Sequence, residues 1–257
     1  MSSIHPTAII HPGAEIGADC EIGPHCLIGP EAILGRGNIL HSHVIVMGQA
    51  RIGDENQIFP YAVIGTDPQD LKYSGDMTGL SIGHRNVIRE FVTINRSNNP
   101  EELTRVGDDN LLMEYVHVAH NCQVGSGCVI ANTVQLAGHL VIGDFASIGG
   151  LTAVHQFVHI GTHAFVGGAS AVKKDIAPYT RGMGNPYKTA GLNSVGLLRK
   201  GYSSESLASI KQIYRVFYRQ GLNVSQALEL VGSWPSLTPE QQIFVNFVRS
   251  SERGLSS

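Results

Sequence analysis

The sequence has little charge and few aromatic residues. Asp, Glu, Lys and Arg make up 15% of the 257 residues, Phe, Trp and Tyr make up 7%, and the net charge is −3. A chain without a basic excess gives no indication of nucleic-acid binding. The 30 glycines that accompany this low charge are unusual for a helical protein and favour a turn-rich β architecture. The length suits one large domain, or one domain with a small appendage.

Long apolar runs and a secretion signal are also missing. Residues 1–10 contain neither a basic segment nor a long apolar stretch, so no signal peptide is predicted. No part of the chain approaches the roughly 18 apolar residues that a membrane span requires. We therefore expect a cytoplasmic protein that does not insert into a membrane.

A six-residue repeat runs through about the first 180 residues. Reading every sixth residue from Ile4 to Val172 gives 29 positions, of which 26 are Ile, Leu or Val. If roughly one half of all residues are apolar, so regular a series would arise by chance only very rarely. The exceptions are Asp70, Asp76 and Pro100, and they fall in two interruptions of the repeat, about residues 66–81 and 96–105.

This period describes a short strand followed by a turn, with one aliphatic side chain pointing inward. Three such units close a triangular coil of 18 residues, and stacked coils pair as parallel strands about 4.8 Å apart. The hexapeptide pattern resembles the left-handed parallel β-helix proteins. The left hand comes from that resemblance, because general connection rules favour right-handed crossovers. We expect a mainly β protein of roughly ten coils, with both interruptions leaving the prism as loops.

Small residues follow the aliphatic series at fixed distances. The four cysteines all come four residues after an aliphatic position, a slot that elsewhere holds alanine. We interpret them as packing residues, because the CxxC-like spacing of metal sites and disulfide frameworks is missing, and free thiols agree with a cytosolic location. Glycine directly follows many aliphatic positions, where we expect tight corners. These cysteines and glycines are Cys20, Cys26, Cys122 and Cys128, and Gly17, Gly23, Gly29, Gly125, Gly143 and Gly161.

The repeat stops after Pro178, and glycine and proline at residues 182–186 mark a boundary. We therefore predict a β-helix domain over residues 1–185 and a C-terminal α-helical domain over residues 186–257.

Three helices are predicted in the C-terminal part. Apolar residues at helical spacing indicate one helix over residues 204–220. Asn223 or Ser225 could cap a second helix that ends near Gly232. A third, with proline at its first helical position, is predicted over residues 238–252.

Four of the twelve histidines fall in three consecutive coils and on one edge of the predicted prism. Gly138 and Gln156 take the position of His120 in the next two coils, so they should lie in line with it. A neutral imidazole beside a glycine could supply a general base and, through the backbone N–H, an oxyanion donor, as acyl transfer requires. The four histidines are His117, His120, His139 and His155.

Two other interpretations of this column remain. Turn positions tolerate histidine, so the column could be accidental. A zinc site is the second, because γ-class carbonic anhydrases use three histidines on this fold. Their ligands include a characteristic pair five residues apart, which these four histidines lack.

Several segments resemble the UDP-N-acetylglucosamine O-acyltransferase family. The resemblance covers nearly the whole chain and is more specific than the repeat, which many acyltransferases share. Sister N-acyltransferases carry an extra N-terminal domain, for which a repeat that begins at Ile4 leaves no room. The segments are residues 111–122, 136–139 and 148–157 around the histidines, 68–73 and 88–94 near the interruptions, and 196–201 in the C-terminal part.

The resemblance implies a reaction and a catalytic pair. His120 matches the family's catalytic histidine, which takes the proton from the sugar 3-hydroxyl as it attacks a 3-hydroxyacyl thioester on acyl carrier protein. Gly138 matches the residue whose N–H faces the oxyanion. The family catalyses the first step of lipid A synthesis with UDP-N-acetylglucosamine as acceptor, as a homotrimer with sites between subunits, and no cofactor or metal is implied.

The resemblance also implies substrate contacts. Asp70 and Lys72 match residues that bind the glucosamine and phosphate side of the acceptor, and Gly168 matches the position that bounds the acyl tail. Four residues around the catalytic histidine match further substrate contacts, and three match nucleotide and phosphate contacts. These are His117, His139, His155 and Gln156, and Asn193, Arg199 and Lys200.

Three positions depart from the family pattern. Asn121 follows His120 where the family commonly has Asp. Its amide oxygen can still accept a hydrogen bond from the imidazole and fix the tautomer, but it stabilises an imidazolium less. Asn95 stands where many members have His, and Val195 where an acidic residue is expected. The acceptor atom, a 3-hydroxyl or a 3-amine, therefore stays open.

A basic stripe is predicted on the first C-terminal helix, because Lys211, Arg215 and Arg219 are spaced four residues apart. Such a stripe suits an acidic carrier protein, and alternatively it is a solvated helix face. Two alternatives of other kinds remain: a binding or structural β-helix, and acyl or succinyl transfer to a small amine. Ice-binding β-helices present rows of Thr-x-Thr, which this chain lacks.

Overall fold

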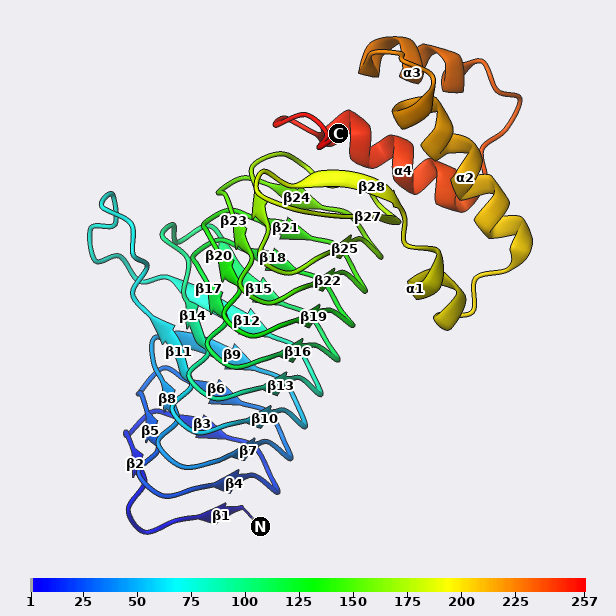
Figure 1. Cartoon of the computed structure of the whole chain (residues 1–257). Coiled ribbons are helices and arrows are strands. Elements are labelled where there is room, and N and C mark those ends of the chain that lie inside the picture. Colours follow the sequence, from blue (N-terminus) through cyan, green and yellow to red (C-terminus); the bar gives the residue numbers. More distant parts are fainter. Residues whose placement is uncertain (1) are drawn as a thin grey trace.

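The computed structural model describes residues 2–257 and consists of a tall prism of short strands with four helices at one end (Figure 1). The strands of the prism from β1 to β27 pair in parallel with strands one coil away, for example Ser3 with Glu21 and Leu111 with Val129. The predicted left-handed parallel β-helix with a helical C-terminal part is confirmed.

Three sheets form the sides of the prism, and each coil contributes one strand to each sheet. The first sheet contains β1 (Ser3–Ile4), β4 (Glu21–Ile22), β7 (Ile39–Leu40), β10 (Gln57–Ile58), β13 (Val87–Ile88), β16 (Leu111–Leu112), β19 (Val129–Ile130), β22 (Ser147–Ile148), β25 (Phe165–Val166), β27 (Thr180–Met183) and β28 (Lys188–Leu192). The second contains β2 (Ile9–Ile10), β5 (Leu27–Ile28), β8 (Ile45–Val46), β11 (Val63–Thr66), β14 (Thr93–Asn95), β17 (His117–Val118), β20 (Gln135–Leu136), β23 (Ala153–Val154) and β26 (Ala171–Val172). The third contains β3 (Glu15–Ile16), β6 (Ile33–Leu34), β9 (Gln49–Ile52), β12 (Gly79–Ile82), β15 (Leu103–Val106), β18 (Gln123–Val124), β21 (Val141–Ile142) and β24 (His159–Ile160).

The aliphatic residues of the repeat fill the inside of the prism. From Ile22 to Val172 every aliphatic position of the series is at most 4% exposed. The second residue of each short strand therefore points inward, as the alternation of side chains along a strand requires.

Glycine stands at the corners as predicted, but the expected reason was wrong. Gly17 and Gly143 do not have a positive φ; the left-handed residue is two positions later, as at Asp19 and Phe145. A Cβ on Gly17 would lie 2.5 Å from a backbone atom of Gly35 in the next coil. These glycines are required because successive coils approach too closely for a side chain.

A ladder of buried asparagines runs along the corner between the third and first sheets. The Asn56 amide donates to Asn38 Oδ1 at 3.0 Å, and its own Oδ1 accepts from the Asn86 backbone and side chain at 2.9 Å. Asn110 continues the ladder, donating its backbone N–H to Asn86 Oδ1 at 3.0 Å. These residues occupy the same slot as Cys20 and Cys128, so the slot accepts amides as well as small side chains.

The cysteines are packing residues, as predicted. All four are free and at most 1% exposed. Burial raises the pKa of Cys122 and of Cys128 to about 12, so both thiols stay neutral near neutral pH.

Both interruptions of the repeat leave the prism at one corner, between the second and third sheets (Figure 1). The loops cover residues 67–78 and 96–102, because β12 and β15 resume pairing earlier than predicted. Gln57 pairs with Val87, 30 residues later, and Val87 with Leu111, 24 residues later.

Four helices follow the prism, one more than predicted. The N-caps of the second, third and fourth helices are Ser203, Asn223 and Thr238. The missed first helix has only six residues, including Gly196, and no apolar periodicity. The helices are α1 (Ser194–Arg199), α2 (Ser204–Arg219), α3 (Val224–Gly232) and α4 (Pro239–Ser250), and none of those in residues 2–257 is long and apolar enough to cross a membrane.

The division into residues 1–185 and 186–257 stays a proposal. β27 and β28 form an antiparallel pair across this boundary. Tyr187 packs in the prism core, whereas Ala177 and Tyr179 pack in the core of the helices. The two cores therefore interlock at the junction.

We predict that Asn56→Ala lowers the free energy of unfolding by about 2–4 kcal/mol, because it leaves several buried ladder groups unsatisfied. Chemical denaturation with a matched thermal scan measures the change. Gln57→Ala, a substitution at the exposed residue that follows Asn56, is the control. Equal stability of the Asn56 variant and the control would contradict a structural role for the ladder.

Candidate active site

Five predicted residues, His120, Gly138, His139, His155 and Gln156, lie at one corner, where the chain passes from the second to the third sheet, and His117 lies just before it on β17. We call this the histidine corner and define it as residues 119–122, 137–140 and 155–158. Backbone hydrogen bonds join its levels: the His139 N–H donates to the His120 carbonyl and the Phe157 N–H to the Gly138 carbonyl, both at 3.1 Å. The stacking predicted from the repeat is therefore present.

The His120 imidazole lies against the backbone of Gly138. A Cβ on Gly138 would lie 2.7 Å from His120 Cε1 and 2.8 Å from Nε2. Any side chain at this position would displace the ring. The absence of a side chain at Gly138 is thus what gives the imidazole its place.

Asn121 fixes the orientation of the His120 ring. Its Oδ1 lies 2.9 Å from His120 Nδ1 and also accepts from the Asn98 backbone N–H at 3.1 Å. Because Oδ1 can only accept a hydrogen bond, the contact requires a proton on His120 Nδ1. Nε2 is left with a lone pair and no hydrogen-bond partner in the described part of the chain.

His117 and His139 flank His120. His117 Nδ1 pairs with Thr93 Oγ1 at 2.7 Å, and the His139 ring meets the His120 ring edge-on, with centroids 5.1 Å apart. Burial lowers the pKa of both His117 and His139, and the charge of a protonated His120 lowers both further. Both rings are therefore held in the neutral form near neutral pH.

His155 and Gln156 form the upper level of the histidine corner. Both are exposed, and His155 Nδ1 contacts the Gln156 carbonyl at 3.1 Å. Neither is held by the dense hydrogen bonding found at His120. Their exposure leaves both side chains accessible to a bound molecule.

Asp70 joins the two loops below the histidines. Its carboxylate accepts from the Lys72 backbone N–H at 3.0 Å and from Asn98 Nδ2 at 2.6 Å. These hydrogen bonds, the one from Lys72 first, lower the pKa of Asp70. The Lys72 side chain is exposed and carries a positive charge on the same loop as Asp70.

The other predicted site residues lie elsewhere on the chain. Gly168 is exposed at the corner between the first and second sheets. Asn193, Arg199 and Lys200 line a cavity of about 690 Å³ between α1 and the first sheet. Asn193 also caps α1 and donates to the His163 carbonyl at 3.0 Å, so part of its role is structural. One chain alone does not bring these residues to His120.

Residues of the second loop were missed by the sequence analysis. Asn98 and Ser97 bond to Asn121 or Asp70, and Glu102 Oε2 accepts a hydrogen bond from Asn121 Nδ2. The interruption of the repeat was their only signal. It located the loop but could not say which of its side chains turn toward the histidine.

Among residues 2–257 no group of three or more His, Cys, Asp or Glu side chains is arranged to hold a metal ion. His120 and His139 meet through ring edges, and His117 pairs with a hydroxyl.

Two family models match the chain. A model described as "Udp N-acetylglucosamine O-acyltransferase; Domain 2" matches residues 175–256. A model described as "Bacterial transferase hexapeptide (six repeats)" matches residues 1–36 and 103–138.

Similar proteins extend the match to nearly the whole chain. The acyl-[acyl-carrier-protein]–UDP-N-acetylglucosamine O-acyltransferase of Verminephrobacter eiseniae is 45% identical over 251 residues, 97% of this chain and 96% of that protein. The UDP-N-acetylglucosamine O-acyltransferase structure from Moraxella catarrhalis is 43% identical, with a TM-score of 0.96 and 99% of each chain covered. The UDP-N-acetylglucosamine acyltransferase structure from Bacteroides fragilis is 42% identical, with a TM-score of 0.95, covering 99% of this chain and 100% of that one.

We predict that His117 contributes to the loss of stability in acid. Its pKa is lowered in the folded state, so the unfolded chain binds the proton first as the pH falls through about 6.5, and folding becomes less favourable. The decrease in melting temperature between pH 7.5 and 5.5 should be smaller in His117→Gln than in the wild type. His11→Gln, at an exposed histidine of the first coil, is the control. An equally steep decrease in the His117 variant would show that this ring does not titrate on unfolding.

Proposed function

Because the chain belongs to the UDP-N-acetylglucosamine O-acyltransferase family, we propose that it transfers an acyl chain from acyl carrier protein to UDP-N-acetylglucosamine. Identity of 45% over 97% of the chain supports this activity. In the finer form of the proposal, a 3-hydroxyacyl chain moves to the glucosamine 3-position in the first step of lipid A synthesis. We place the reaction in the cytoplasm, a compartment that suits four free thiols.

The contact between His120 and Gly138 is the observation that carries this function. In the proposal, His120 Nε2 takes the proton of the acceptor hydroxyl while its oxygen attacks the thioester carbonyl. The resulting tetrahedral intermediate collapses with cleavage of the carbon–sulfur bond. The leaving thiolate takes the proton back from His120, which restores the neutral ring.

Gly138 is proposed to stabilise the negative oxygen of that intermediate. Its N–H donates no hydrogen bond to any group in residues 2–257, and it lies directly beside the His120 ring. A free backbone donor next to the base is what an acyl-transfer transition state needs.

The acceptor is proposed to bind along the histidine corner. Asp70 and Lys72 would contact its glucosamine and phosphate side, since their loop leaves the prism two coils below His120 and Asp70 bonds to Asn98 on the loop between them. His117 and His139, both neutral, and the exposed His155 and Gln156 would supply further contacts. These roles rest on proximity and family membership.

A homotrimer would complete the site. Gly168, proposed to bound the acyl tail, lies on a different corner from His120. Exposed apolar side chains follow that same corner at Phe91, Tyr115 and Leu151, the last being 70% exposed. A neighbouring subunit packed over this surface would bury them and bring Gly168 to the cleft beside His120.

The nucleotide is proposed to lie in the cavity beside α1 of a neighbouring subunit. Asn193, Arg199 and Lys200 line that cavity, and two positive charges suit a diphosphate. Val195, 61% exposed, lines it where an acidic residue was expected.

We predict that His120→Ala lowers turnover by roughly 10²–10⁴-fold, the usual range for loss of a general base. Mass spectrometry of products formed from 3-hydroxyacyl carrier thioesters and UDP-N-acetylglucosamine measures it, and the 3-amino sugar nucleotide as second acceptor identifies the accepting atom. His25→Ala, outside the histidine corner, should change little. Wild-type turnover in the His120 variant would exclude this mechanism.

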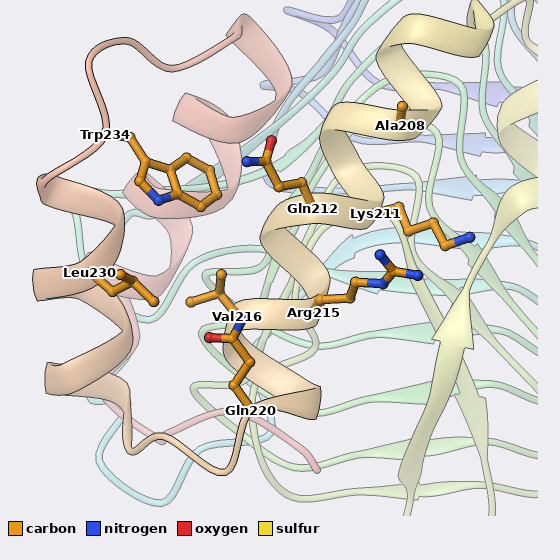
Figure 2. A pocket seen from close by; sticks show the side chains of 8 residues that line it. All are labelled: Ala208, Lys211, Gln212, Arg215, Val216, Gln220, Leu230 and Trp234. Carbon is orange, nitrogen blue, oxygen red and sulfur yellow. The ribbon is translucent and has the colours of Figure 1, made fainter.

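The carrier protein is proposed to dock on α2. Lys211, Arg215 and Arg219 are exposed on this helix. A cavity of about 520 Å³ lies between α2 on one side and α3 with the segment that follows it on the other. Figure 2 shows Lys211 and Arg215 pointing to the same side, away from Trp234 on the opposite wall of this cavity. A basic surface of this kind attracts acidic proteins and raises their rate of association.

We predict that changing Lys211, Arg215 and Arg219 together to Glu raises the KM for acyl carrier protein and flattens its dependence on salt. The lost interaction is screened Coulomb attraction, so the KM for UDP-N-acetylglucosamine should hardly change. Initial rates at several salt concentrations provide the measurement. If the KM for the carrier protein stayed the same, the stripe would be a solvated helix face.

A further inference from the structure

A chain of hydrogen bonds leads from His120 to a carboxylate outside the histidine corner. His120 Nδ1 contacts Asn121 Oδ1 at 2.9 Å, and Asn121 Nδ2 donates in turn to Glu102 Oε2. Glu102 lies on the loop between β14 and β15, and Asn121 is 4% exposed. The neutral Asn121 amide thus lies between the His120 ring and the Glu102 carboxylate.

The Asn121 amide has all four of its hydrogen-bonding positions occupied. Oδ1 accepts from His120 and from the Asn98 backbone, and Nδ2 donates to Glu102 and to Ser97 Oγ at 3.2 Å. Its backbone N–H is held as well, by Thr104 Oγ1 at 2.8 Å. A buried amide bonded on every side has one fixed orientation.

The partners of Nδ2 decide which way the amide faces. Ser97 Oγ gives its only proton to the Asn99 carbonyl at 2.7 Å, so toward Asn121 it can only accept. Glu102, as a carboxylate, is also an acceptor. A rotated amide would turn its oxygen toward these two acceptors and its NH₂ toward the Asn98 N–H. Of the two acceptors only Glu102 carries a charge.

We propose that Glu102 is a positioning residue for His120. Its carboxylate holds Asn121 so that Oδ1 accepts a hydrogen bond from the His120 Nδ1–H and leaves Nε2 as the base. Its negative charge also stabilises the ring when Nε2 takes up a proton, transmitted through the polarised amide. The inference rests on the proposed function, in which His120 is the general base.

Other titratable groups surround His120 and contribute to its electrostatic environment. His117 on β17 and His139 on the next coil are neutral rings, and Lys72 carries a positive charge on the loop below. Asp70 carries a negative charge, but it is bonded to Asn98 and to the Lys72 backbone rather than to the amide that holds His120. A change confined to Glu102 can therefore be separated from their effects.

The first test compares Glu102→Gln with Glu101→Gln. Glutamine can still accept from Asn121 Nδ2 but has no charge, so we expect kcat to fall by about tenfold, equivalent to about 1.4 kcal/mol, with both KM values unchanged. The acid limb of the kcat profile should shift to lower pH, because a protonated imidazole loses its stabilising charge. Glu101 loses the same charge one residue away, and its side chain makes no hydrogen bond or ion pair in residues 2–257.

A second test uses Asn121→Asp. This variant puts a carboxylate directly on His120 Nδ1 but also within hydrogen-bond distance of Glu102, where two negative charges repel each other. Adding Glu102→Gln to Asn121→Asp should therefore raise kcat, the opposite of its effect on the wild type. A purely structural Glu102 would lower activity in both backgrounds, and this result would overturn the inference.

Nitrogen-15 spectra of the His120 ring separate this inference from the proposed function. They report which ring nitrogen carries the proton without any substrate, and we expect Nδ1–H in the wild type and a mixture of tautomers in Glu102→Ala. If the wild type formed no acylated sugar, the proposed function would fall while the spectra still tested the role of Glu102. An unchanged tautomer in Glu102→Ala, or a pH profile of Glu102→Gln that matches Glu101→Gln, would overturn the inference.

Discussion

The structure depends on the main-chain hydrogen bonds that join each coil to the next. The Gly17 N–H donates to the Leu34 carbonyl at 2.8 Å, and bonds of this kind recur at every level of the prism. Because each coil repeats the path of the one below, a position in the repeat becomes a column in space. His120, Gly138 and Gln156 are separated along the chain by a full coil each and still form one column. A side chain at Gly138 would meet the His120 ring of the coil below, so the stacking of coils that builds the prism also shapes the proposed site.

Much of the fold could be predicted from the sequence, because one inward side chain per short strand leaves a regular aliphatic series. The loops were located by their departure from that series, although pairing resumes earlier, at Gly79 and Leu103, because strand pairing does not require an aliphatic residue. The asparagine ladder was missed, since a buried amide is stable only with a partner one coil away, which composition does not reveal. The helix α1 was missed because its stability comes from the Asn193 cap and from packing of Leu197 rather than from a periodic face.

The candidate site could be predicted in part for the same reason. Residues in phase with the repeat, His120 and Gly138, were placed together correctly by counting. Residues in the loops have no phase, so the contacts of Asn98 and Glu102 with the histidine corner depend on how the loops fold back. Asn193 and Gly168 lie away from His120 within one chain, so their proposed roles require a neighbouring subunit. No pattern within one chain specifies how copies pack.

The asparagine ladder and the two loops occupy different corners, and this separation affects how such a protein can evolve. Extra residues at the ladder corner would leave buried amides without partners, at a cost of about 1–3 kcal/mol for each. Extra residues in the exposed part of the first loop, such as residues 74–77, would lie in solvent, and doubling a loop adds only about 0.6 kcal/mol of closure entropy. The prism thus tolerates insertions at the corner where the substrate is proposed to bind. Changes in loop length can reshape the binding surface while the coils beneath keep their register.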